Sequence, residues 1–306
     1  MKKLSLRAAG ADEGERLDRF IAARGGISRG EARRALDRGG VFLSGKRCKT
    51  ASRAVRAGDR VEVHLEEAGR APAAAAALDR SRLLYADEAL AAFDKPAGVP
   101  SQPTLTSDRG HLPELAAQLL GGPVLPVHRL DRETSGAVVL ARTREAAAAL
   151  SLAFREGTAA KRYLALCARA PSPPEGRIDL PLGPDPRRPG RRMVLPSGEP
   201  AVTGWRTLAV GPSGEAAVEA RPETGRTHQI RVHLAHLGAP LLGDARYGGP
   251  RRLLELAVPR VMLHALRLEL PHPLTGAPLR FEAPLPADLL AVARALGIEL
   301  ASLASK

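Results

Sequence analysis

Hydrophobic positions recur at two spacings along the first part of the chain, and these spacings predict a compact arrangement of helices and strands. Residues 15–24 place three apolar side chains on one helical face, namely Leu17, Phe20 and Ile21. Ser28 and Glu31 form a capping box that opens a second helix, which should end at Gly39-Gly40 after Arg38. The apolar run 41–43 and the alternation over 61–65 are typical of strands. We therefore expect a small unit of two helices and a sheet over residues 15–65.

The rest of the chain follows a different plan. Residues 66–81 are rich in alanine and lack a two-sided pattern, which indicates a linker, although part of it could be helical. Beyond residue 82, strands are predicted at 83–85, 90–93, 137–141, 161–167, 266–270 and 279–282, and helices at 112–120, 145–155 and 287–296. The interpretation is an α+β fold with a larger domain over 82–290 on a mainly antiparallel sheet, then a C-terminal helix and tail over 291–306.

Two segments carry special patterns. Residues 227–237 alternate like a strand, but their apolar spacing fits a helix better, with Thr227 as a candidate N-cap and Gly238 as the stop. Residues 181–200 are rich in Pro, Gly and Arg and predict an exposed basic loop, which either contacts RNA or is simply solvated.

The amino-acid composition indicates what kind of partner the protein binds. The 306 residues carry a net charge of +13. Residues 1–70 hold 17 Lys and Arg against 10 Asp and Glu, a net of +7. Such a basic chain most often binds a polyanion, with nucleic acid the first candidate, although a generally arginine-rich composition would look similar. Cys48 and Cys167 are too isolated for a disulfide framework or zinc site. No run is long enough to span a membrane and the start lacks the apolar core of a signal peptide, so a cytoplasmic protein is expected.

The strongest candidate chemistry lies before the strand at 137–141. Asp131 sits there on a loop between Arg129 and Arg132, and nearby guanidinium groups should keep its carboxylate ionised. An ionised carboxylate suits a nucleophile or base better than a proton donor. For an arbitrary loop aspartate, a surface ion-pair cluster would be the simpler interpretation.

The run His-Arg-Leu-Asp-Arg-Glu-Thr-Ser-Gly over residues 128–136 resembles the signature of the RluA-type RNA pseudouridine synthases. The resemblance implies that Asp131 is the essential catalytic residue. Residues 161–167 resemble the second motif of that family, in which Tyr163 would pack against the target base as a stacking platform and could also accept a proton near it. Residues 221–233 resemble the third, in which Arg231 would pair with Asp131. Arg129 would fill the space that the displaced base leaves, or hold a flanking phosphate.

Residues 15–66 resemble the S4-type RNA-binding module. This resemblance implies that Arg29, Arg33, Arg34 and Lys46 contact RNA phosphates and position the enzyme. The alternative is a solvated charged face. We favour RNA contact because the charge asymmetry and the module agree.

A metal site was considered at His228, His233 and His236. Of these, His233 and His236 have usable helical spacing, but no nearby Asp or Glu shares their face, so metal binding is disfavoured. The isomerisation that the family carries out is redox-neutral and hydrolyses nothing, so no cofactor is expected either.

The predicted function is the isomerisation of uridine to pseudouridine in structured RNA by a monomer. Large-subunit ribosomal RNA is the favoured target and transfer RNA the open alternative. Asp131 would attack C1′ or remove the C2′ proton. Two rival functions are a catalytically silent RNA-binding protein of the same fold and a nucleic-acid glycosidase, which would need a second carboxylate poised as an acid.

Overall fold

The computed structural model describes residues 2–65, 78–253 and 255–300, which form two compact units. Of the described residues, the first unit contains 2–65 and 99–115, and the second contains 78–98, 116–253 and 255–300. The predicted linker over 66–81 falls largely on residues 66–77, which lie outside the described residues, as does the tail over 301–306. The proposed domain boundaries therefore stay predictions.

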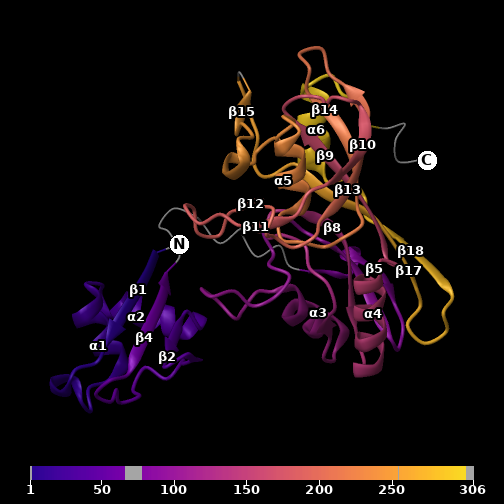
Figure 1. Ribbon diagram of the computed structural model, residues 1–306. Helices are drawn as coiled ribbons and strands as arrows, with labels where there is room; N and C mark the ends of the chain where they lie inside the picture. Colours follow the sequence, from indigo (N-terminus) through magenta and orange to yellow (C-terminus); the bar gives the residue numbers. More distant parts are fainter. Residues whose placement is uncertain (1, 66–77, 254, 301–306) are drawn as a thin grey trace. The chain divides into compact units, whose positions relative to one another are not determined.

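The first unit packs two helices on a four-stranded antiparallel sheet (Figure 1). The helices are α1 (Leu17–Gly25) and α2 (Arg29–Arg38), and the strand order is β1 (Lys2–Arg7), β4 (Arg60–Leu65), β2 (Val41–Leu43) and β3 (Lys46–Arg47). Ser28 and Glu31 form the predicted capping box of α2, and Gly39 ends the helix in the left-handed conformation. The three apolar residues predicted for one face of α1 are fully buried. Each such side chain stabilises the fold by about 1.5–3 kcal/mol.

Two features of this unit were not predicted. Strand β1 pairs along its whole length with β4, although none of its side chains is fully buried and its sequence pattern is correspondingly weak. Residues 99–115 also belong here, because Arg47 Nη2 donates a hydrogen bond to the carbonyl of Thr104 (2.7 Å) and Lys49 pairs with Asp108 (2.8 Å).

The second unit is organised on a ten-stranded sheet. Its path runs β10 (Glu175–Asp179), β13 (Val202–Val210), β14 (Ala216–Pro222), β9 (Ala160–Cys167), β17 (Leu263–Pro271), β8 (Ser135–Ala141), β6 (Leu90–Lys95) and β5 (Leu83–Ala86). Strand β18 (Pro278–Glu282) pairs with β17, and β7 (Leu125–Pro126) pairs with β8. All pairs are antiparallel except β17 with β8, so the predicted α+β class with a mainly antiparallel sheet is confirmed.

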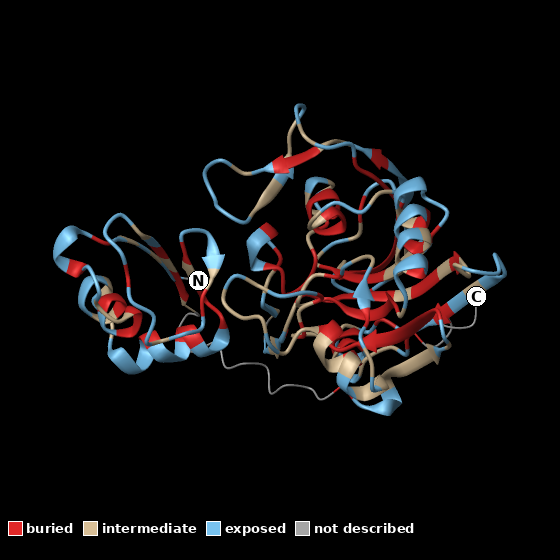
Figure 2. Ribbon diagram, turned by 90° about the horizontal axis from the view of Figure 1, so that it is seen from below, coloured by how far each residue is buried: buried red, intermediate tan, exposed pale blue. Residues whose placement is uncertain are grey.

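Helices cover both faces of this sheet, which explains why its central strands, such as β6, β8 and β14, are buried over almost their whole length (Figure 2). Alternate residues of β9 separate to the two sides: Ala165 and Cys167 pack with α5 (Gln229–His236), whereas Leu164 and Leu166 pack with α6 (Ala287–Ala295). Helix α4 (Arg144–Glu156) packs beside β8, with Thr143 as its N-cap as predicted. Helix α3 (Leu112–Leu120) matches its predicted range.

Three predictions need correction. Strands β10, β13 and β14 were missed because their sequences mix small, polar and apolar residues without clean alternation. The predicted basic loop over 181–200 contains a hairpin of β11 (Leu182–Pro184) and β12 (Arg192–Val194), anchored by the buried Leu182. Helix α5 begins one residue later than expected, since its N-cap is His228 and not Thr227. Two further short strands, β15 (Arg252–Leu253) and β16 (Leu256–Ala257), pair with each other.

Candidate active site

Asp131 lies on the loop between β7 and β8. His128, on the same loop, ties the loop to strand β8. His128 Nε2 accepts a hydrogen bond from the backbone N–H of Val139 (2.9 Å), and its ring stacks on Phe154 with centroids 4.2 Å apart. Burial lowers the pKa of His128 to about 3, so the ring stays neutral and can accept. At the end of the loop Gly136 has a φ of +115°, and a Cβ there would lie 2.2 Å from the carbonyl oxygen of Ala265. A glycine is therefore required where the loop joins β8.

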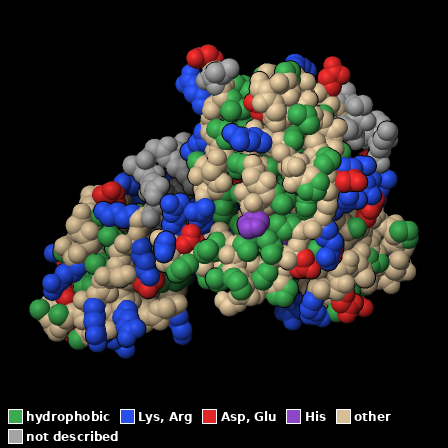
Figure 3. All heavy atoms as spheres, turned by 45° about the horizontal axis from the view of Figure 1, so that its top comes forward, with side chains coloured by type: hydrophobic (Ala, Val, Ile, Leu, Met, Phe, Trp, Pro, Cys, Tyr) green, Lys and Arg blue, Asp and Glu red, His purple; other side chains and the backbone are tan. Residues whose placement is uncertain are grey.

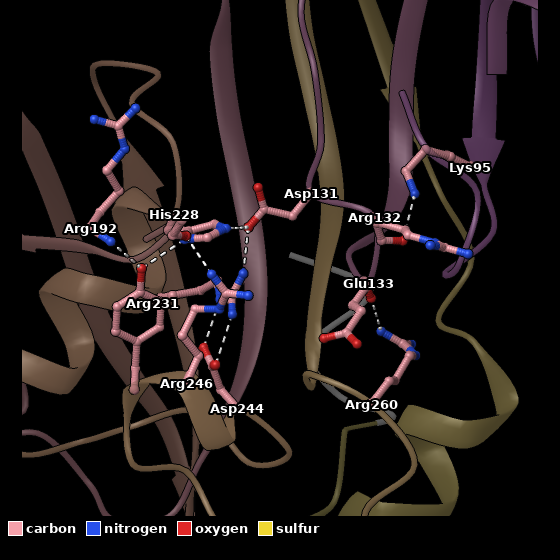
Figure 4. Close-up of polar contacts among 12 residues, drawn as sticks. Lys95, Asp131, Arg132, Glu133, Arg192, His228, Arg231, Asp244, Arg246 and Arg260 are labelled. Atoms are coloured by element: carbon pink, nitrogen blue, oxygen red, sulfur yellow. Dashed lines mark hydrogen bonds and ion pairs between the residues drawn. The ribbon is translucent and has the colours of Figure 1, made fainter. Parts of the chain in front are cut away.

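The other side of the loop is held by cations that bind its carbonyl groups. Lys95, fully buried at the end of β6, donates to the carbonyl of Arg132 (3.3 Å), and burial lowers its pKa to about 7. Arg260 donates to the carbonyl of Glu133 (3.2 Å) while it pairs with Asp288 of α6 (2.6 Å) (Figure 4). The loop is thus tied to β6 and, through Arg260, to α6.

The arginines next to Asp131 in sequence do not contact its carboxylate. Arg132 turns away and donates from Nε to the carbonyl of Gly98 (2.9 Å), while Arg129 is exposed at the cavity. The expectation of a carboxylate between these two guanidinium groups was wrong, because side chains at neighbouring positions of an irregular loop point in different directions. The cation that meets Asp131 comes instead from 100 residues further along the chain.

That cation is Arg231, on α5. Its Nη1 lies 3.0 Å from Asp131 Oδ2, and its other edge makes two hydrogen bonds to Asp244, from Nε (2.7 Å) and Nη2 (2.8 Å) (Figure 4). Burial would lower the pKa of Arg231, but the hydrogen bonds to Asp244 and the charges of both carboxylates outweigh it and raise that pKa. The structure therefore brings Arg231 to Asp131 as predicted, but the bidentate partner is Asp244, which had no predicted role.

Two aromatic residues complete this cluster. His228 Nε2 lies 3.8 Å from Asp131 Oδ2, and its Nδ1 is hydrogen-bonded to the hydroxyl of Tyr247 (2.7 Å). The ring of Tyr247 also lies under the guanidinium of Arg231, 5.1 Å from its centroid. The sequence Gly-Asp-Ala-Arg-Tyr-Gly over 243–248 was the available signal for Asp244 and Tyr247, but no local pattern connects it to Asp131.

Asp131 opens onto a cavity of about 400 Å³. Tyr163 and Lys161 of β9 line it, together with residues 222–231 and Arg155. Burial, with the nearby charge of Asp131, raises the pKa of Tyr163, so its phenol stays protonated. Lys161 donates to the carbonyl of Thr224 (3.0 Å), and burial lowers its pKa to about 8. Cavities of this size hold small organic groups, and the lining of this one combines aromatic rings with several charged side chains.

The predicted RNA-contacting side chains lie in the first unit. Arg29 and Arg33 each reach the buried carboxylate of Asp18 through Nε, at 3.0 and 3.1 Å, and still leave about half of their side chains exposed. Arg34 and Lys46 are exposed. Figure 3 shows Lys and Arg side chains projecting from the surface of this unit.

The three histidines considered for a metal do not form a common site. Both ring nitrogens of His233 are engaged in the core, with Thr203 Oγ1 (2.9 Å) and the carbonyl of Leu180 (3.0 Å). Within residues 2–65, 78–253 and 255–300 the structure contains no group of three or more His, Cys, Asp and Glu side chains that could bind a metal ion. None of the helices it describes is long and apolar enough to cross a membrane.

Comparison with known proteins identifies the family. The family described as RNA pseudouridylate synthase matches residues 89–236, and the S4 domain matches residues 15–61. An RNA pseudouridine synthase of Chloroflexus aurantiacus is 40% identical over 92% of this chain and 90% of its own length. The chain belongs to the RNA pseudouridine synthases.

Other members of the family support this assignment. The dual-specificity RNA pseudouridine synthase RluA of Escherichia coli is 37% identical over 66% of this chain and 92% of its own length. The structure of human RNA pseudouridylate synthase domain containing 4 is 29% identical, with a TM-score of 0.60 over 74% of this chain and 96% of that one. The predicted family, the S4 module and the enzyme class are thereby confirmed, and the protein is an isomerase that forms pseudouridine.

Proposed function

We propose that this pseudouridine synthase converts uridine to pseudouridine in structured RNA with Asp131 as the catalytic residue, acting on large-subunit ribosomal RNA. The observation that carries the proposal is the state of the Asp131 carboxylate. Each of its described hydrogen bonds and ion pairs goes to Oδ2, and the side chain borders the cavity. Oδ1 is therefore the oxygen presented to a nucleotide, next to a guanidinium that stabilises the negative charge.

The reaction needs one ionised carboxylate and an aromatic surface. Oδ1 of Asp131 starts it by attack on C1′ or by removal of the C2′ proton, and both routes require the charged form. The N1–C1′ bond breaks and the uracil rotates. C5 then bonds to C1′ as the Asp131–C1′ bond breaks or, on the other route, as the proton returns from Asp131 to C2′. The proton on C5 leaves to solvent while N1 gains one. Tyr163, whose raised pKa keeps it a neutral phenol, provides a face on which the uracil stacks and turns. It is poorly suited to serve as a base.

Access of the base requires that it leave its stack in the RNA. Arg129, exposed at the cavity, would fill the vacated space or hold a flanking phosphate. In the S4 module, Arg29, Arg33, Arg34 and Lys46 would contact phosphates and position the RNA, since all four are exposed.

A glycosidase is disfavoured by the carboxylates of the cavity. Among the described lining residues these are Asp131 and Glu223. Glu223 forms two hydrogen bonds with Arg177 (2.8 and 3.0 Å), which lower its pKa, so it is not an acid poised to protonate a leaving group. Glu133 is the carboxylate nearest to Asp131 in sequence, but it is not among the described residues that line the cavity.

The test is release of tritium from [5-³H]uridine-labelled ribosomal and transfer RNA pools, with wild type and Asp131→Asn compared. Release by wild type and none by the variant supports the proposal, and the responding pool identifies the RNA class. Response by transfer RNA alone would replace the ribosomal target. Free uracil in the products would establish hydrolysis, and RNA binding without tritium release from either pool would favour a silent binder.

A further inference from the structure

His228 has an unusual backbone. Its φ and ψ are 60° and 18°, the left-handed conformation, and among the described residues it shares a positive φ outside glycine with Ser44 alone. Residues other than glycine are uncommon there because Cβ crowds the carbonyl group, although asparagine, aspartate and histidine adopt this conformation more often than the rest. Such residues cluster at functional sites, where the surrounding structure maintains the strain. Here the conformation occurs at the N-cap of α5, three residues before Arg231, with the imidazole in the cavity.

Both nitrogens of this imidazole face defined partners. Nδ1 lies 2.7 Å from the hydroxyl of Tyr247, and Nε2 lies 3.8 Å from Asp131 Oδ2 (Figure 4). A carboxylate opposite Nε2 favours a proton on that nitrogen, so Nδ1 is the acceptor and the Tyr247 hydroxyl donates to it. The same hydroxyl oxygen accepts the backbone N–H of Arg192 (2.9 Å), which is compatible with this assignment because an oxygen can accept and donate at once.

We propose that His228 is a positioning residue for Asp131, and that its Nε2–H becomes the second hydrogen-bond donor to Oδ2, beside Nη1 of Arg231, when RNA fills the cavity. The inference rests on the proposed role of Asp131. At 3.8 Å the pair is too long for a hydrogen bond, and such contacts in free enzymes often tighten in the substrate complex. Two donors on one oxygen fix the plane of the carboxylate and leave Oδ1 aimed at the nucleotide.

The protonation state of His228 agrees with a donor and not with a proton carrier. Burial lowers its pKa to about 4, against the opposing effect of the charge on Asp131. The ring is therefore neutral at physiological pH and offers one N–H. The charged and titratable groups that face it are Asp131, Arg231, Arg246, Asp244 and Tyr247.

The test uses three substitutions of His228 in the full-length protein. His228→Ala removes the ring, His228→Gln keeps a donor near the position of Nε2, and His228→Gly removes the ring together with the backbone strain. Single-turnover tritium release is measured on whichever labelled RNA pool wild type modifies, along with the RNA concentration at half-maximal rate. Unfolding temperatures of all variants are recorded in parallel.

We expect the alanine and glycine variants to lose roughly 10- to 100-fold in single-turnover rate, the range for one hydrogen bond to a charged group. The concentration at half-maximal rate should change by less than about threefold, and His228→Gln should recover most of the rate. The glycine variant is decisive because it should unfold at or above the wild-type temperature. A glycine variant with the wild-type rate, or a glutamine variant as slow as alanine, would overturn the proposal.

A second measurement does not depend on activity. In protein labelled with ¹⁵N-histidine, long-range ¹H–¹⁵N spectra should show His228, assigned by its absence in His228→Gln, as the neutral Nε2–H tautomer between pH 6 and 8. An Nδ1–H tautomer would overturn the inference even if wild type is active. Failure of wild type to release tritium would instead count against the proposed function, while the tautomer still decides the geometry at His228.

Discussion

Asp18 and Asp131 both pair with arginines, and the difference between them separates a structural carboxylate from a chemical one. Asp18 of the S4 module is fully buried and meets three guanidinium groups, with Arg16 on Oδ1 (3.2 Å) and Arg29 and Arg33 on Oδ2. Asp131 keeps 17% of its side chain exposed and has one arginine, on Oδ2. A carboxylate whose oxygens are all bonded has nothing left to offer a substrate. One that is bonded on a single oxygen and borders a cavity has an oxygen available for chemistry.

Asp244 lies between these cases and sharpens the comparison. It is 1% exposed, and both of its carboxylate oxygens accept hydrogen bonds from Arg231. In this respect it resembles Asp18. However, its partner is the same guanidinium that contacts Asp131. Its role is to hold the arginine, and the arginine's third hydrogen bond then reaches the reactive carboxylate.

The largest expected effect comes from Asp131→Asn. Loss of the charged oxygen should reduce single-turnover pseudouridine formation by roughly 10⁴-fold or more, as for removal of other catalytic groups. The free energy of unfolding should change by less than about 1 kcal/mol, because the side chain is partly exposed. Rate assays combined with chemical denaturation measure both. A large loss of stability with retained activity would reverse the distinction between Asp18 and Asp131.

Asp244→Asn should affect rate and stability together. A buried guanidinium that loses its bidentate carboxylate is left poorly compensated, which costs about 3 kcal/mol of unfolding free energy. The rate should fall roughly 100-fold as Arg231 loses its orientation. Asp179→Asn is the matched control, since Asp179 is exposed and pairs with Arg177 at 3.3 Å on the surface. Equal effects of the two substitutions would mean that Asp244 does not orient Arg231 for the reaction.

Asp18→Asn should lower stability and RNA affinity without changing the rate at saturating RNA. Burial would raise the pKa of Asp18, but hydrogen bonds from the three arginines lower it to about 2. The pKa of an aspartate in the unfolded chain is near 3.9, so folding favours the charged form of Asp18. The contribution of the ionised Asp18 carboxylate to the free energy of unfolding is complete above about pH 5 and disappears as the pH falls from about 4 to 2.

Denaturation of wild type and Asp18→Asn across that pH range tests the prediction. The difference in unfolding free energy should be about 1–3 kcal/mol at pH 7 and should approach zero near pH 2. A difference that stays constant with pH would mean that packing, and not charge, explains the substitution.

The smallest effect is expected for Lys46→Ala. If Lys46 contacts one phosphate, RNA affinity should fall a few-fold, and the slope of log affinity against log salt should decrease by about 0.7–0.9. Arg19→Ala is the control, since Arg19 is exposed on α1 and has no proposed RNA contact. Filter binding over a salt series measures both. An unchanged slope would assign Lys46 to a solvated face.

Much of the molecule could be predicted from local sequence. The capping box at Ser28, the N-cap at Thr143 and the strand over 161–167 all occur as expected. Each depends on residues close together in the chain, whose backbone conformations follow from capping and periodicity. Strand β14 escaped prediction because burial on both faces removes the alternation that marks a strand, and β13 because it is buried only in its first half and shows no regular alternation.

The sequence by itself determined the family, the α+β class, and the presence of Asp131, Tyr163 and Arg231 in three ordered motifs. Apart from the pairing of Arg231 with Asp131, which the family resemblance implied, the tertiary structure alone decided which groups meet. Arg231 reaches Asp131 and Asp244, although Arg129 and Arg132 are nearer to Asp131 in sequence, and Arg29 and Arg33 meet Asp18. The reason is geometric: charge pairing acts over a few ångströms, and the register of strands and the placement of α5 determine which distant side chains come within that range.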